Sequence, residues 1–266
     1  MRLADEESNG STRILSLVPS ISELLAALGL APLMVGRTGF CVHPAEVMAG
    51  LPKVGGTKDV NLDKVRQLAP THLIVNMDEN RRETVAALRD VVPHVLVTHP
   101  NAPEDNLALL AQLTQAFGRH PGVRERADAL AQDLQSALSE LRCRSWPVER
   151  VLYLIWREPW MTVARDTYIA RMLAEVGWQT WPAIEGGAVG ALRYPMLDGH
   201  EPWLKDVQRV LLSSEPYAFD ARHMAEAQAL CPAARVQCVD GELLSWYGPR
   251  AAQGLRYLRD LALDLR

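Results

Sequence analysis

Short apolar runs alternate with helical patterns from Arg13 to Gly118. The runs RILSLV, PLMVGRT, THLIVN and HVLVTH predict strands, and SISELLAALG, NLDKVRQLAP, NRRETVAALRDV and EDNLALLAQLTQAFG predict helices. We place Ser20 as the N-cap of the first helix, with Glu23 completing a capping box, and Asn61 as the cap of the second. Strands that alternate with helices of this length favour a parallel α/β sheet. Residues 13–118 are therefore predicted to form an N-terminal α/β lobe.

The pattern changes after Pro121, where a single long amphipathic segment begins. PGVRERADALAQDLQSALSELRCR has no internal helix breaker after Gly122 and repeats apolar residues at helical spacing up to Leu141. About 22 residues at 1.5 Å each make a rod of roughly 33 Å, which is long for a crossover between strands. We predict that residues 119–145 form a backbone helix that links two lobes.

A second α/β pattern fills residues 146–266. RVLYLIW, VQRVLLSS and ARVQCVD predict strands, and DTYIARMLAEVGW, DARHMAEAQALC and GPRAAQGLRYLRDLALDL predict helices. The predicted fold class is α/β: two lobes, each with a mainly parallel sheet flanked by helices, joined by one long helix. Because no low-complexity linker interrupts the chain, we expect a rigid clamshell with a cleft between the lobes.

Aromatic residues gather in the segments that follow the predicted strands. Ligands of open parallel sheets bind beyond the carboxyl ends of the strands. A single Trp or Tyr there more often covers the end of a sheet, but several on one side favour an aromatic-lined cleft for a large flat ligand. The aromatic residues of these segments are Phe40, Trp156, Trp160, Tyr217, Phe219, Trp246 and Tyr247. All of these except Phe219, together with His43 and Asn76, are the ligand-binding candidates.

The stretch FCVHP contains the only candidate metal donor of this set. His43 is predicted to lie in the wall of the pocket, either donating a hydrogen bond or serving as an axial donor to the metal of a bound chelate. The alternative is a histidine that binds a loop carbonyl. Cys41, next to Phe40, is predicted to be a buried small apolar residue.

Catalytic motifs are absent from the sequence. It contains no H-E-x-x-H, no closed Cys/His quartet and no G-x-S-x-G, and VGGTKDVN lacks the spacing of a dinucleotide or Walker loop. We therefore predict no catalytic residue and a protein that is not an enzyme.

Composition and charge narrow the function classes further. Hydrophobic residues make up 48% and charged residues 23%, as in an ordinary globular chain, and the net charge of -4 with no basic run indicates no nucleic-acid partner. Cys231 and Cys238 could be bridged, but spacing alone does not decide this. The start MRLADEESNGSTR has neither a basic nor an apolar signal region, which predicts a cytoplasmic protein, or a periplasmic or cell-surface one if a signal peptide was removed.

Two blocks carry a family resemblance. RILSLVPSISELLAALGL and GGTKDVNLDKVRQLAPTHLIV, followed by a single long helix and a second α/β half, resemble the helical-backbone metal receptor superfamily. These are class III substrate-binding proteins of ABC importers, and the cobalamin-binding branch looks closest. The resemblance runs from Arg13 to the C-terminus. It implies a monomer without covalent cofactor that binds cobalamin or another corrinoid, or less closely a ferric siderophore or haem, and that delivers it to an ABC permease.

The match is partial when it is followed residue by residue. His43-Pro44 stands where the cobalamin receptors have an aromatic residue and proline, Thr57 replaces a tryptophan, and Trp246 matches a late tryptophan. The resemblance also implies that Asp63 and Glu201 dock to the transporter. An enzyme or chaperone of corrinoid or haem metabolism, using His43 or Glu215 as an acid or base, is the alternative, and a protein-interaction module is a third.

Overall fold

The computed structural model describes residues 11–264, which form two compact units. Unit 1 extends to Thr98, and unit 2 begins at His99. The predicted absence of a signal sequence concerns residues 1–10, which lie outside the described residues. The division into lobes of residues 13–118 and 146–266 with a linking helix stays a prediction, and each unit is described by itself below.

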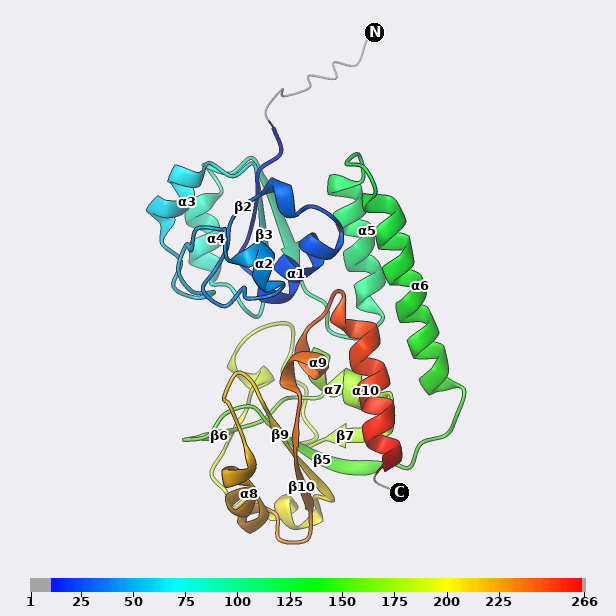
Figure 1. Cartoon of the computed structure of the whole chain (residues 1–266). Helices are drawn as coiled ribbons and strands as arrows, with labels where there is room; N and C mark the ends of the chain where they lie inside the picture. Colours follow the sequence, from blue (N-terminus) through cyan, green and yellow to red (C-terminus); the bar gives the residue numbers. More distant parts are fainter. Residues whose placement is uncertain (1–10, 265–266) are drawn as a thin grey trace. The chain divides into compact units, whose positions relative to one another are not determined.

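Unit 1 is a parallel α/β layer. Its four strands are hydrogen-bonded in the order β2-β1-β3-β4, and all pairs are parallel. Figure 1 shows α1 on one side of this sheet and α3 and α4 on the other, as right-handed crossovers require. The elements are β1 (Ile14–Ser16), α1 (Pro19–Ala27), β2 (Met34–Gly36), α2 (Ala45–Met48), α3 (Leu62–Leu68), β3 (His72–Asn76), α4 (Arg82–Leu88) and β4 (His94–Thr98).

The first turn of α1 differs from the prediction. The N-cap is Val18, with no side-chain hydrogen bond to the helix, and Pro19 occupies the first turn. Proline is preorganised for this position, so the helix begins before Ser20, and the predicted capping box is wrong. The predicted cap of α3 is correct, because Asn61 accepts a hydrogen bond from the backbone N–H of Lys64 at 2.9 Å.

Unit 2 contains a second parallel sheet, in the order β10-β9-β5-β7, and a small antiparallel pair, β6-β8. Its strands are β5 (Glu149–Leu154), β6 (Trp160–Met161), β7 (Trp178–Thr180), β8 (Met196–Leu197), β9 (Arg209–Ser213) and β10 (Arg235–Val239). Its helices are α5 (Asp105–Phe117), α6 (Val123–Arg142), α7 (Tyr168–Ala174), α8 (Met224–Leu230), α9 (Gly241–Ser245) and α10 (Arg250–Asp264).

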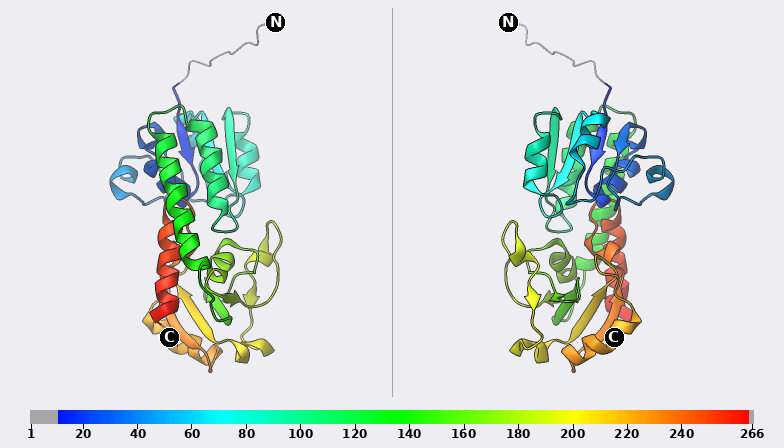
Figure 2. Two further views of the ribbon diagram at one scale, coloured as in Figure 1. Left: turned by 90° about the vertical axis from the view of Figure 1, so that its right-hand side faces the viewer. Right: turned by 90° about the vertical axis from the view of Figure 1, so that its left-hand side faces the viewer.

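The long helix α6 lies inside the range predicted for it. It contacts α5 and α10 along its length, and Figure 2 shows α6 and α10 side by side. Ion pairs join the two helices on the solvent side, from Arg256 to Asp133 at 2.6 Å and from Arg259 to Glu140 at 2.5 Å. The apolar residues of α6 at helical spacing, among them Val123 and Leu134, are buried.

Three short strands of unit 2 were not predicted. β7 has only three residues, and β6 and β8 have two each. Trp178 and Thr180 are buried on either side of exposed Gln179, so the alternation typical of a strand exists but is too short to separate from the end of a helix. Gly177, with φ of 78°, ends the preceding turn and lets the chain enter β7.

Two further features bear on the sequence-based expectations. Within residues 11–264 no helix combines the length and the apolar character needed to cross a bilayer. The four cysteines are free thiols, with Cys231 buried and Cys238 exposed, so the two do not form a disulfide in this structure.

Candidate ligand-binding site

The carboxyl edge of each parallel sheet carries exposed apolar side chains. In unit 1, Phe40 and Val42 follow β2 and Met77 follows β3, with exposed fractions of 64%, 45% and 43%. In unit 2, Trp156 follows β5 and is 41% exposed. Large apolar side chains left exposed at the edge where open sheets bind ligands indicate a binding surface.

A buried arginine holds the loop of unit 1 that presents Phe40. Arg37 donates hydrogen bonds to the carbonyls of Met48 at 2.7 Å, Thr38 at 3.1 Å and Cys41 at 3.0 Å. Because its fork of donors satisfies three loop carbonyls, the guanidinium fixes the turn while Phe40 stays exposed. This arginine was not predicted as part of the site.

Cys41 is buried, as predicted. Its Sγ lies 3.1 Å from the hydroxyls of Ser22 and Thr38. Burial raises the pKa of the Cys41 thiol, and hydrogen bonds from the two hydroxyls oppose that rise only in part. The thiol is therefore a structural, protonated group.

Asn76 occupies the end of β3 and is almost fully buried. Its Oδ1 accepts the backbone N–H of Asp78 at 2.8 Å and of Glu79 at 3.3 Å, which is an Asx turn. The amide side chain therefore shapes the loop that exposes Met77. Ligand contact by Asn76 stays a prediction, and Met77 is an exposed candidate that the sequence pattern did not single out.

Four aromatic rings of unit 2 form one cluster at the ends of β5 and β9. Trp156 meets Tyr217 edge-on with centroids 5.6 Å apart, and Tyr217 lies 4.6 Å from Phe219. Trp160 stacks on Phe219 at 6.0 Å with an interplanar angle of 7°. The structure thus brings together three of the predicted ligand-binding aromatics, and Trp156 is the most exposed of them.

The remaining two predicted aromatics are buried. Trp246 is only 8% exposed, donates its indole N–H to Glu215 Oε1 at 2.5 Å, and has the Arg250 guanidinium 5.0 Å from its ring centroid. Tyr247 meets Tyr168 edge-on at 5.8 Å. Their ligand contacts stay predictions, but little of either ring surface is left exposed.

Glu215 is a half-buried carboxyl group beside the aromatic cluster. Burial raises its pKa, while hydrogen bonds from the Ser245 hydroxyl and the Trp246 indole act in the opposite direction. Both donors converge on Oε1, at 2.9 Å and 2.5 Å. The Glu215 carboxyl group therefore orients Trp246 and holds Ser245, at the start of the segment that leads into α10.

Three arginines near this edge of unit 2 are engaged by carboxylates. A cavity of about 480 Å³ opens beside Tyr217, but the two arginines that line it each have a carboxylate partner. The Arg222 guanidinium and backbone N–H lower the pKa of Asp220 to about 2, so this pair is charged at neutral pH. The pairs are Arg157 with Glu226 at 2.5 Å, Arg222 with Asp220 at 2.6 Å, and Arg250 with Glu242 at 2.8 Å.

No resident metal centre is evident among residues 11–264, because nowhere do three His, Cys, Asp or Glu side chains converge to hold an ion. His43, half-buried in the loop after β2, remains the candidate axial donor to a ligand's metal. Near the carboxyl edge of unit 1, the half-buried His43 and the exposed Met77 could each donate to a metal, as could the carboxylates of Asp78 and Glu79 in the loop after β3.

The predicted docking carboxylates differ in their surroundings. Asp63 lies in the first turn of α3, 84% exposed, and pairs with Arg66 at 2.8 Å. Glu201 instead accepts the backbone N–H of Asp198 at 2.8 Å and of Gly199 at 3.1 Å, and so closes the turn before the Pro202–Asp206 segment.

Comparison with known proteins places the chain in a family. Residues 14–193 match the model of the family described as periplasmic binding protein. An uncharacterized ABC transporter substrate-binding lipoprotein of Bacillus subtilis, YvrC, is 22% identical over 265 residues, covering 93% of this chain and 79% of the relative.

Solved structures agree on the fold. The periplasmic vitamin B12-binding protein BtuF of Vibrio cholerae superimposes with a TM-score of 0.77 at 17% identity, covering 95% of this chain and 96% of that one. The periplasmic haem-binding protein RhuT of Roseiflexus sp. RS-1 gives 0.75 at 22% identity, covering 96% and 99%. The predicted fold class, two parallel-sheet domains flanked by helices, is confirmed, and the chain belongs to the periplasmic binding protein family.

Proposed function

We propose that this protein is the substrate-binding component of an ABC importer and that its ligand is a corrinoid such as cobalamin. The proposal rests on the family, on the likeness to a vitamin B12-binding protein, and on the apolar side chains exposed at the carboxyl edges of the two sheets. The relatives named above are binding proteins, so we propose no enzymatic activity.

The state of the arginines favours a corrinoid over haem. Haem carries two propionates and many ferric siderophores are anionic, so their receptors need cations that are free to pair with them. In the described part of unit 2, Arg157, Arg222 and Arg250 near the carboxyl edge are each paired with a carboxylate. A corrinoid periphery of neutral amides needs hydrogen bonds and apolar contact rather than spare cations.

We assign the ligand contacts by exposure. Phe40 and Trp156 offer the largest exposed ring surfaces and would cover apolar faces of the ligand. Tyr217 and Trp160 would support Trp156 through the aromatic cluster of unit 2, and Tyr247, which packs on Tyr168, would add at most a small exposed edge. Asn76 and Trp246 would act chiefly through the loops that they hold, and His43 would donate a hydrogen bond or an axial nitrogen to the metal.

Docking to the permease is proposed to use Asp63 and Glu201. Asp63 is a highly exposed carboxylate, which suits pairing with arginines of a transporter. Glu201 already accepts hydrogen bonds from two backbone N–H groups. In docking it would therefore also act by fixing the conformation of the turn that meets the permease.

The test is retention of chelates by the purified protein. Aquocobalamin, cobinamide, haem and a ferric siderophore are each mixed with the protein and passed through a desalting column, and visible spectra of the protein fraction are recorded. We expect a corrinoid to co-elute in a one-to-one ratio and haem to be lost. Retention of haem or siderophore with loss of both corrinoids would overturn the ligand assignment, and loss of all four would overturn the proposed function.

A further inference from the structure

The connection between β7 and β8, residues 181–195, carries exposed apolar side chains in its second half, and another begins β8. Val189 is 52% exposed, Leu192 70%, and Met196, the first residue of β8, 68%. The connection leaves the carboxyl end of β7, and Figure 1 shows it at the same end of the unit 2 sheet as α9, which follows β10. Its tip is therefore apolar surface at the edge that carries Trp156.

Strand pairing joins this surface to Trp156. Met161 pairs with Trp156 through an antiparallel bridge and with Met196 in the β6-β8 ladder. Residues that pair directly across antiparallel strands project on the same face, so Trp156, Met161 and Met196 form one row. The opposite face belongs to Trp160 and Leu197, which pair with each other and pack on the core of unit 2.

Two short contacts fix the base of the connection. Asp166 accepts the backbone N–H of Gly186 and of Gly187, each at 2.8 Å. Burial would raise the pKa of Asp166, but these hydrogen bonds and the nearby Arg193 lower it overall, so the carboxylate is charged. A Cβ on Gly186 would lie 2.4 Å from the Cα of Arg193, so only glycine allows this approach.

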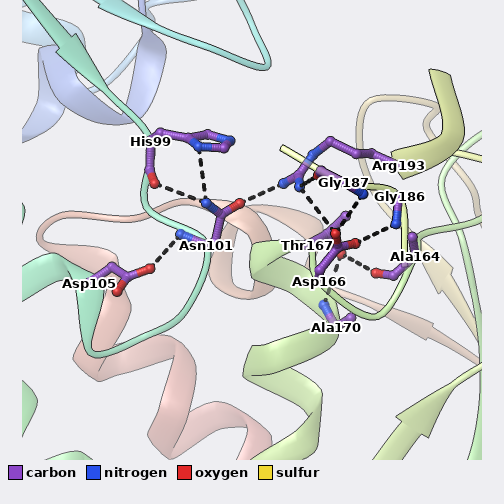
Figure 3. A network of polar contacts seen from close by, with 10 residues as sticks. All are labelled: His99, Asn101, Asp105, Ala164, Asp166, Thr167, Ala170, Gly186, Gly187 and Arg193. Atoms are coloured by element: carbon purple, nitrogen blue, oxygen red, sulfur yellow. Dashed lines mark hydrogen bonds and ion pairs between the residues drawn. The ribbon is translucent and has the colours of Figure 1, made fainter. Parts of the chain in front are cut away.

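Arg193 is the centre of the network, and its side chain is almost completely buried. Figure 3 shows its guanidinium pointing toward Asn101, Gly187 and Asp166. It donates to the Gly187 carbonyl at 2.7 Å and to Asn101 Oδ1 at 2.6 Å, and it lies 4.0 Å from Asp166. Burying a guanidinium is costly unless its donors find acceptors, so the bonds from its two terminal nitrogens favour one arrangement of the connection.

We propose that the row Trp156–Met161–Met196, continued by Val189 and Leu192, is an apolar wall that contacts the ligand, and that Arg193 is its positioning residue. The inference rests on the proposed function and commits to the chelate as the occupant, because the row is continuous with Trp156. Flexible methionine and leucine side chains would fit the puckered alkyl face of a corrin, which flat aromatic stacking alone would not cover.

The wall is tested with Leu192→Ser and Met196→Ser, titrated with whichever of the four chelates the wild type retains. Each substitution is expected to weaken binding about tenfold, the loss that follows from leaving one such apolar contact unmade. Val148→Ser is the matched control: Val148 is 63% exposed but precedes β5, at the opposite edge of the sheet, so its affinity should stay within twofold of wild type.

The positioning role is tested through Asn101, because Arg193→Ala removes a buried charge network and could prevent folding. Asn101→Ala takes away one acceptor of Arg193, and we expect it to weaken binding several-fold. In the Leu192→Ser background the same change should cost much less, because the side chain that it positions is gone. A purely structural role would give the same loss in both backgrounds.

The outcomes distinguish a failure of the apolar wall from a failure of the proposed function. If the wild type retains a chelate and both serine variants bind it as tightly as Val148→Ser does, the apolar wall is refuted while the proposed function stands. If the Asn101→Ala losses are additive, Arg193 is not a positioning residue. If the wild type retains none of the four chelates, the proposed function falls and the wall falls with it.

Discussion

Trp156 and Trp246 should contribute very differently to ligand affinity. From the sequence both receive the same role, since each follows a strand of the second half. In the structure Trp156 is 41% exposed and Trp246 8%. A tryptophan side chain has about 250 Å² of surface, so Trp156 offers roughly 100 Å² to a ligand and Trp246 roughly 20 Å².

These areas set upper limits for the two substitutions. At about 25 cal/mol per Å², covering the exposed part of Trp156 is worth at most about 2.5 kcal/mol, or about 70-fold in Kd. The same conversion for Trp246 gives about 0.5 kcal/mol, or about twofold. Trp156→Ala should therefore weaken binding by one to two orders of magnitude, and Trp246→Ala only slightly through direct contact.

The assay is fluorescence or absorbance titration of the retained chelate into wild type, Trp156→Ala and Trp246→Ala. Circular dichroism and the midpoint of urea unfolding check that each variant is folded. Trp246→Ala should instead be visible in stability, because it leaves Glu215 without one of its two donors. Equal losses of affinity for the two folded variants would refute the use of exposure to rank the ligand contacts.

Three further expectations concern ionisable side chains. Glu215 has a raised pKa in the folded protein, so it favours folding fully below its usual value of 4.5, and that contribution is lost as pH rises through the folded value. Wild type should therefore lose more unfolding free energy between pH 4 and pH 7 than Glu215→Gln, and parallel urea curves at both pH values would contradict this. Replacing Asp63 and Glu201 together by Ala should abolish stimulation of a reconstituted importer's ATPase with ligand affinity unchanged; a loss of affinity would move them to the ligand site. His43→Ala should shift the visible band of bound aquocobalamin if its imidazole is an axial donor, and an unshifted band with weaker binding would identify a hydrogen bond.

The regular elements could be predicted because their periodicity is long. α5, α6 and α10 each repeat apolar residues over three or more turns, and the strands β3, β5 and β9 are continuous apolar runs buried on both faces. The elements that were missed have five residues or fewer. β6 and β8 exist because they pair with each other, which no local pattern specifies.

The location of the candidate site could be predicted from the sequence, but which of its side chains are exposed could not. Loops after parallel strands identified Phe40 and Trp156 correctly as residues of the carboxyl edge. Burial of Trp246 depends on Glu215, 31 positions away in the chain, and exposure of Met196 depends on pairing with Met161. Such contacts are tertiary, so a single sequence read by spacing gives all these residues equal weight.

The two loops that are each held by a buried arginine follow strands at the edges of their sheets. β2 is an edge strand of the unit 1 sheet and β7 an edge strand of the unit 2 sheet. A loop leaving an edge strand has a neighbour on one side only, so its carbonyls lack partners from the sheet. In each case a buried arginine supplies donors, Arg37 to three carbonyls after β2, and Arg193 to the Gly187 carbonyl after β7 and to the Asn101 side chain before α5.

This shared solution explains how a binding surface can be apolar and rigid at once. Exposing apolar side chains to water is unfavourable. Such a loop would therefore fold back onto its own unit unless its backbone were held in place. The planar guanidinium holds it from beneath, with donors in a fixed geometry that lysine could not reproduce. The buried guanidinium groups of Arg37 and Arg193 hold the loops that carry these apolar side chains. As a result, Phe40 stays exposed on unit 1, and Leu192 and Met196 stay exposed on unit 2. Arg37 and Arg193 would then shape the proposed ligand surface rather than attract an anion, which is consistent with the neutral corrinoid proposed as the ligand.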